Sequence, residues 1–173
     1  SDVYKRQVPV NIPGGELYTA LQTGVIDATE WVGPYNDLAF GFQQIAKYYY
    51  FPGWHEPGSM LEFIINLDAW NELPTHLQSI VKTAAKAVNQ DLLDEYTAMN
   101  NQALRELIDV HNVQLKKLPD DVINEFRVIS KSVLDEIAEN DNQFKSIYES
   151  YLKFKSEVVS YHEISEDAYT KIR

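Results

Sequence analysis

Two glutamates, Glu30 and Glu56, have the sequence surroundings most suited to binding chemistry. Each stands beside a Trp or a His, at an expected strand end that is flanked by a Gly-Pro or Pro-Gly pair. Ligands of open α/β sheets gather at the carboxyl ends of strands, and carboxylate oxygens suit Na⁺ or Ca²⁺. The pair is therefore consistent with a cation site. Spacing alone favours two unrelated surface glutamates, because this residue type is mostly exposed.

Aromatic side chains cluster around the same two positions. Trp31, Tyr35 and Trp54 have the residue type that walls small-ligand clefts, which are apolar with a few polar anchors. Ordinary core packing is the alternative, and for the run Tyr48–Tyr50 it is the interpretation we favour. Trp31 and Trp54 lie beside chain breaks and acids, so both interpretations stay open for them.

Catalytic motifs are absent from the sequence. It contains no cysteine, no HExxH, no GxSxG and no glycine loop that would cradle phosphates. His55 next to Glu56 resembles an acid–base pair, but neighbours on a strand point to opposite sides, whereas such catalysis needs groups that converge on one atom. A hydrolase or lyase that uses Glu56 and His55 is thus an alternative function, and the main expectation is a protein that is not an enzyme.

The bulk composition restricts the partners. The formal net charge of -11 leaves no basic footprint for nucleic acid or for an anionic membrane surface. No apolar run approaches the length that crosses a bilayer. A hydrophobic content of 45% permits a sizeable core.

Composition divides the chain into three parts. Residues 1–7 share no pattern with the rest of the chain and are interpreted as a non-native leader. Residues 8–74 are rich in Gly, Pro and aromatics and are expected to form an α/β ligand-site segment. The expected elements are strands at 8–10, 25–28, 48–51 and 60–66, and helices at 16–23, which Gly24 would end, and at 37–47.

Residues 75–173 are helical in pattern and contain no glycine. Apolar residues recur at helical spacing from Thr75 to about Val110, which predicts a helix on the order of 50 Å long. A compact domain of this size is only very roughly 40 Å across, so the helix should protrude from one lobe or bridge two. Thr75 and Gln78 fit a capping box. Beyond this helix we expect a short strand at 113–118, a helix from Pro119, a break at 140–142, a further helix, and a last short helix for which Ser165 is the capping candidate.

Three stretches resemble a known family. VPVNIPGGELYTALQTGVID (residues 8–27), ATEWVGPYNDLAFGF (28–42) and YYYFPGWHEPG (48–58) are similar to TRAP-transporter extracytoplasmic solute-binding proteins, the DctP-like family, and to its branch that binds 2-oxo acids with a cation. The resemblance covers nearly all of residues 8–173, and the two central stretches are its most specific part.

The resemblance implies a periplasmic-binding-protein-like α/β fold, helix-rich, with a long helix that spans two lobes. It implies that Glu30 and Glu56 hold a bound cation, Na⁺ or Ca²⁺, and that Trp31 contributes its backbone carbonyl to the cation and its ring to the pocket wall. Tyr35, Asn36, Trp54 and Glu56 become substrate-binding candidates. The implied function is periplasmic: capture of a small monocarboxylate, such as the 2-oxo acid pyruvate, and delivery to the membrane subunits of a TRAP transporter.

The arginine content departs from the family pattern. The family holds the substrate carboxylate with an arginine, and this chain has none between Arg6 and Arg105. The sequence is therefore interpreted as a C-terminal part that lacks the first lobe, binds ligand poorly alone and exposes apolar surface. A helical interaction domain at 75–173 is the remaining alternative, and its long helices suit pairing between chains as well as packing within one.

Overall fold

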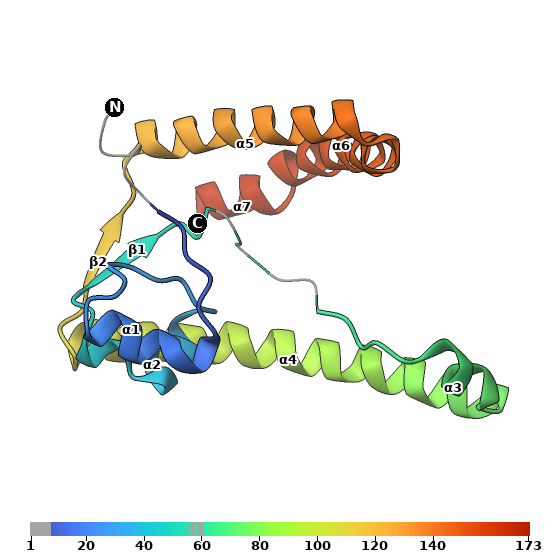
Figure 1. The fold of residues 1–173 in the computed structure, drawn as a ribbon, viewed down its shortest axis with the longest axis horizontal. Coiled ribbons are helices and arrows are strands. Elements are labelled where there is room, and N and C mark those ends of the chain that lie inside the picture. Colours follow the sequence, from blue (N-terminus) through green and yellow to red (C-terminus); the bar gives the residue numbers. More distant parts are fainter. Residues whose placement is uncertain (1–7, 55, 57, 59–60) are drawn as a thin grey trace. The chain divides into compact units, whose positions relative to one another are not determined.

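A computed structural model describes residues 8–54, 56, 58 and 61–173. These residues form two compact units, one ending at Lys117 and one comprising Leu118–Arg173. Helices dominate both (Figure 1). In chain order they are α1 (Leu17–Gln22), α2 (Pro34–Phe40), α3 (Leu67–Glu72), α4 (Thr75–Asp109), α5 (Asp120–Asn140), α6 (Asn142–Ile164) and α7 (Glu166–Ile172), with 3₁₀ turns at Gly14–Glu16 and Phe42–Gln44.

The described strands are β1 (Tyr48–Phe51) and β2 (Gln114–Lys117), which pair in parallel. Tyr48 lies opposite Gln114 and Phe51 lies opposite Lys117. Pro52, which has no N–H, comes directly after β1 and ends the ladder. The strands expected at 48–51 and 113–118 are thus confirmed.

The other expected strands are wrong for the described residues. Residues 8–10, 25–28 and 61–66 belong to no strand, and the first residue of the predicted 60–66 strand lies outside the described part. Most of their apolar side chains are exposed, Val8 to 80% and Ile64 to 85%. A strand exists only where a neighbour accepts its hydrogen bonds, so β-prone composition alone did not suffice.

Helix α1 ends as its sequence predicts. Gly24 comes after it with φ +74°, the left-handed conformation that glycine adopts most cheaply. The Val25 N–H donates to the Ala20 carbonyl (2.9 Å) and the Gly24 N–H donates to the Leu21 carbonyl (3.3 Å), which is a Schellman motif. This motif directs the chain from α1 into the loop that carries Glu30.

Helix α2 starts and ends earlier than the predicted 37–47 helix. Pro34 occupies its first position, where the missing N–H costs nothing. Gly41, at φ +87°, ends the helix, and a 3₁₀ turn replaces the rest. The helical periodicity was correct, but both boundaries result from the proline and the glycine.

Helix α4 confirms the predicted long helix. Its 35 residues span about 52 Å at 1.5 Å per residue. Helix α2 packs against it within the first unit (Figure 1). The expected capping box is wrong, because Pro74 precedes the first turn, and the Gln78 amide instead donates to the carbonyls of Trp70 (3.0 Å) and Leu73 (3.1 Å).

The second unit consists of α5, α6 and α7. The break predicted at 140–142 is confirmed at Asp141, whose carboxylate accepts the Gln143 and Phe144 N–H groups at 2.8 and 2.9 Å. Ser165 precedes α7, but its hydroxyl donates back to the Tyr161 carbonyl. Among the helices of the described chain, none combines the length and apolarity needed to cross a bilayer.

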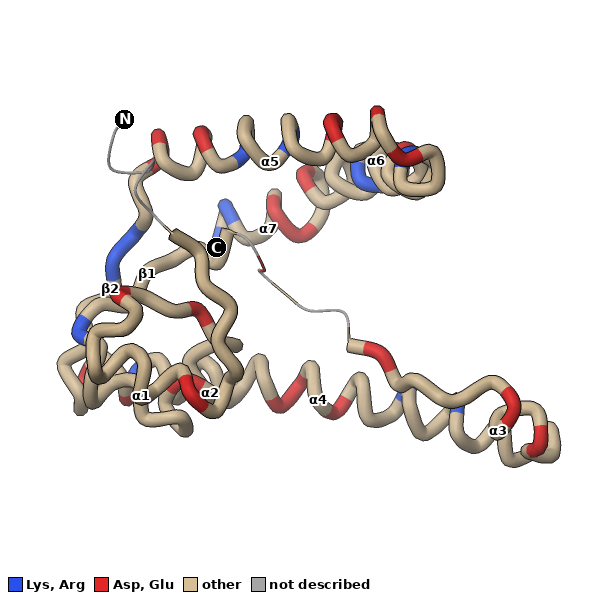
Figure 2. Tube along the Cα trace, in the orientation of Figure 1, with Lys and Arg blue, Asp and Glu red and all other residues tan. Residues whose placement is uncertain are grey.

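Few apolar residues of the described chain are buried. The buried set is Ala20, Phe42, Ala103, Leu107, Val113 and Val122. Large apolar side chains are exposed on residues 61–67 and along α4, including Phe63 (74%) and Val88 (63%). The expectation of exposed apolar surface is confirmed for these residues. Acidic and basic residues both occur along the helices, and the two adjacent lysines of β2 form a visible basic stretch (Figure 2).

Candidate functional site

The loop between α1 and α2 is fixed by one buried carboxylate, Asp37. Among the described residues, Asp37 is the charged residue that is buried, with 7% of its surface exposed. Oδ1 accepts the N–H groups of Val32 (3.3 Å) and Gly33 (3.4 Å), and Oδ2 accepts the Tyr49 hydroxyl at 2.5 Å. Asp37 therefore ties the turn after Glu30 to strand β1.

Burial changes the protonation chemistry of this pair. Burial raises the pKa of Asp37 above its ordinary value, the hydrogen bonds from Tyr49, Val32 and Gly33 oppose that shift, and the negative charge of Glu30 adds to it. Burial, and to a lesser extent the contact with Asp37, raises the pKa of Tyr49 far above its ordinary range. Tyr49 therefore stays protonated and donates to Asp37.

This shift predicts how stability depends on pH. A carboxyl whose pKa is higher in the folded state contributes stability that is complete below its unfolded pKa, about 3.8, and is lost as the pH rises through the folded value. Asp37→Asn removes this titration. The unfolding free energy of the wild type minus that of Asp37→Asn should therefore fall as the pH rises above the unfolded pKa of about 3.8. Urea unfolding at several pH values measures it, and a difference that grows with pH contradicts the prediction.

A residue of α4 holds the start of α2. The Asn100 side-chain oxygen accepts the Tyr35 N–H at 2.9 Å, one of the amides that a helix start leaves without an internal partner. A Cβ added to Gly33 would lie 3.2 Å from the same oxygen, so a larger residue there would force Asn100 to shift. The loop after Glu30 is thus held from β1 and from α4.

Trp31 lies in this loop with its indole packed inside the first unit. The ring stacks at a tilt on Phe40, with 5.2 Å between centroids. It also covers Gly14 so closely that an added Cβ would approach Cη2 to 2.7 Å. About a third of Trp31 remains exposed (36%), which suits a residue that packs on one side and faces a ligand on the other.

The other cleft-wall candidates lie in different settings. Tyr35 meets Tyr96 edge to face at 6.1 Å, and its hydroxyl lies 3.5 Å from a Glu95 oxygen. The Asn36 side-chain oxygen is buried and accepts no hydrogen bond within the described part of the chain. Trp54 is 44% exposed. The core assignment of Tyr48–Tyr50 is wrong for Tyr48 and Tyr50, since β1 is an exposed strand and only its Tyr49 side is covered.

Glu30 and Glu56 both have exposed side chains. Glu30 lies in the α1–α2 loop, close enough to Asp37 for its charge to raise that group's pKa. Glu56 comes after β1, and its carbonyl oxygen lies 3.7 Å from the Cβ that Gly53 would carry. Among the described residues no three Asp, Glu or His side chains gather around a common point. Two carboxylates fit an oxygen-seeking cation only if carbonyls and the ligand complete its shell.

The acid–base interpretation depends on His55. That residue lies outside the described residues. Asp37, Tyr49 and Asn100, by contrast, are structural residues of the site that no motif indicates. Asp37 is one of 26 acidic residues, and only its position four residues after Gly33, at a helix start, hinted at a turn-binding role.

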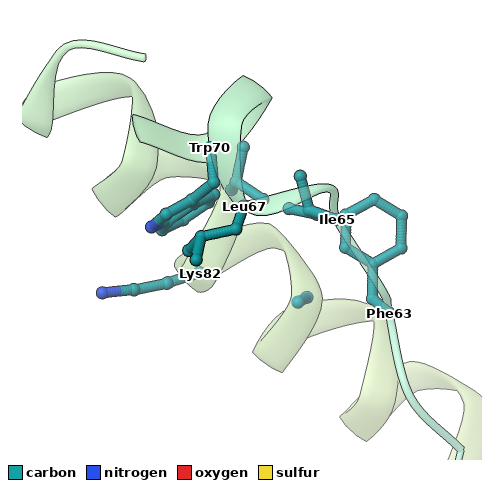
Figure 3. Close-up of a pocket in the computed structure, with 7 residues that line it drawn as sticks. Phe63, Ile65, Leu67, Trp70 and Lys82 are labelled. Carbon is teal, nitrogen blue, oxygen red and sulfur yellow. The ribbon is translucent and has the colours of Figure 1, made fainter. Parts of the chain in front are cut away.

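A separate hollow of about 440 Å³ lies between residues 63–70 and α4 (Figure 3). It contains none of the candidate residues. Its lining is Phe63, Ile65, Leu67, Trp70, Val81, Lys82 and Ala85. The Lys82 ammonium lies 5.4 Å from the centre of the Trp70 ring, a cation–π distance. This open apolar surface suits packing against protein better than the binding of a small acid.

Comparison with known proteins gives this site its context. Residues 5–141 match the family model described as bacterial extracellular solute-binding protein, family 7. The chain is 39% identical over 158 residues to a monocarboxylate 2-oxoacid-binding periplasmic protein from Nostoc sp. (strain PCC 7120), covering 91% of this chain and 43% of the relative.

Solved structures agree on the fold. A TRAP transporter solute-binding protein from Bordetella bronchiseptica RB50 matches with a TM-score of 0.88 and 34% identity, over 95% of this chain and 49% of that one. That protein was crystallised with copurified calcium and picolinate in its active site. A TRAP periplasmic solute-binding protein from Chromohalobacter salexigens, 20% identical with a TM-score of 0.66, covers 88% of this chain and 47% of that one and shares the fold.

These matches confirm the expected periplasmic-binding-protein-like fold. The chain spans about half the length of the relatives it matches. Those relatives are solute-binding proteins and not enzymes, which confirms the main expectation over the hydrolase alternative.

Proposed function

Because the chain belongs to the bacterial extracellular solute-binding protein family 7, we propose that it supplies one part of the ligand site of a periplasmic TRAP-transporter binding protein. The ligand is a small monocarboxylate, a 2-oxo acid such as pyruvate, held through a bound cation and delivered to the transporter's membrane subunits. The observation that carries the proposal is the 39% identity, over 91% of the chain, to a 2-oxoacid-binding periplasmic protein.

The charges of the two glutamates call for a cation. A substrate carboxylate placed beside Glu30 and Glu56 would be repelled, and close like charges in a low dielectric cost several kcal/mol. A cation between them reverses the local field and lets the carboxylate and keto oxygens of the substrate chelate it. Trp31 would add its backbone carbonyl. Na⁺ and Ca²⁺ both accept such a shell, and the calcium in the Bordetella protein favours testing Ca²⁺ first.

The rest of the site would come from outside this sequence. The described part of the chain buries few large apolar residues and exposes Leu61, Phe63 and Ile64 beside the hollow on α4. We propose that this surface packs against the remaining half of the family fold, which would also supply the arginine for the substrate carboxylate. Trp31, Tyr35, Asn36 and Trp54 would wall the cleft from this side.

A thermal-shift screen tests the proposal. The longest natural polypeptide that contains this sequence is mixed with pyruvate, longer 2-oxo acids and lactate, each with Ca²⁺, Na⁺ or a chelator. Ligand that binds only the folded state stabilises it by about 2.7 kcal/mol at a hundred times Kd. The melting temperature should rise for a 2-oxo acid with one cation, and the acid should be recovered unchanged. No shift with any acid and cation would remove the ligand assignment.

A further inference from the structure

A set of hydrogen bonds to one buried carboxylate connects the two segments to which the binding chemistry is assigned. The Glu30–Gly33 turn carries two of the candidate residues, and β1 leads directly into the segment that carries Trp54 and Glu56. Neither segment is regular structure at the candidate positions themselves. Their relative placement must therefore come from side-chain contacts nearby.

Asp37 supplies those contacts from a single carboxylate. One oxygen holds the N–H groups of Val32 and Gly33, and the other holds the hydroxyl of Tyr49 in β1. The residue is 7% exposed, so water competes little for these bonds. Asn100 adds a second attachment, from α4 to the N–H of Tyr35.

We propose that Asp37 is a positioning residue: together with Tyr49 it sets where the Glu30–Gly33 turn lies relative to β1 and thereby sets ligand affinity. The inference rests on the proposed function for its effect on binding. In this role Asp37 acts through the turn and through Tyr49 and not by contact with ligand or cation. A buried negative charge of this kind is costly to keep, and its three hydrogen bonds to loop and strand account for its placement.

Tyr49→Phe is the test, because it removes one hydroxyl and leaves the aromatic ring. The matched control is Tyr18→Phe, which removes a long, exposed hydrogen bond to Gln44 (3.4 Å) in the same unit. Both variants are made in the longest natural polypeptide that contains the sequence. Amide exchange at Val32 and Gly33 is followed by NMR well below the melting temperature, and pyruvate affinity with Ca²⁺ by calorimetry.

Tyr49→Phe should speed exchange at both amides, and weaken pyruvate binding, each by about tenfold, the equivalent of one lost buried hydrogen bond. The inference is overturned if Tyr49→Phe behaves like Tyr18→Phe, or if exchange quickens while affinity stays the same. If the wild type binds none of the acids, the proposed function fails. In that case amide exchange alone tests the positioning role of Asp37: exchange in Tyr49→Phe that equals exchange in Tyr18→Phe overturns it, and faster exchange supports it.

Discussion

Replacing Glu30 with glutamine is expected to weaken 2-oxo acid binding by at least about a hundredfold in the longest natural polypeptide that contains this sequence. Changes behind a metal ligand already cost about 10- to 100-fold in affinity, and this change removes a ligand charge itself. Glutamine keeps the size of the side chain but cannot neutralise a cation. Glu56→Gln should have a similar effect, and calorimetry with and without Ca²⁺ measures both.

The control for this pair is Glu16→Gln, an exposed glutamate of the 3₁₀ turn before α1. It makes the same chemical change without a role in the site and should leave affinity unchanged. Because the expected loss is tied to the cation, the two site variants should respond weakly to added Ca²⁺. Full affinity in either variant would remove that glutamate from the site.

Leu107→Ala is expected to lower the free energy of unfolding by about 3 kcal/mol. Leu107 is 3% exposed near the end of α4, and a leucine deleted from a core loses its transfer energy and leaves a cavity. The first unit has few such residues, so one deletion removes a large share of its burial. Urea unfolding followed by circular dichroism measures the change.

Leu93→Ala serves as its comparison on the same helix. Leu93 is 60% exposed, and alanine favours the helix at least as well. Its loss should stay below about 1 kcal/mol. Equal destabilisation by the two changes would mean that the buried end of α4 is not where the unit gains its stability.

The sequence was most informative where a pattern is local and long. The apolar repeat of α4 predicted a helix from Thr75 to about Val110, and the structure has Thr75–Asp109. Gly24 and the break predicted at 140–142 marked helix ends for reasons contained in a few residues. Strands were predicted less well, because residues 61–66 have a strand-like composition but no described neighbour to pair with.

The residues of the site were likewise predictable only in part. The stretches around Glu30 and Glu56 resemble a family strongly enough to be recognised, and the family match bears that out. The roles of Glu30 and Glu56 as cation ligands stay predictions. Asp37 and Asn100 were not foreseen, because their importance depends on Tyr49 and Tyr35, which are 12 and 65 residues away from them in sequence. Contacts of that kind arise from folding and leave no short motif.

A crystal structure of the longest natural polypeptide that contains this sequence, grown with pyruvate and Ca²⁺, would show directly whether a cation joins the two glutamates to the acid. We expect one calcium ion, located by its anomalous signal, about 2.3–2.6 Å from carboxylate oxygens of both Glu30 and Glu56 and from oxygens of the acid. Pyruvate bound with no cation, or the two carboxylates facing away from each other on different surfaces, would contradict the proposed cation site.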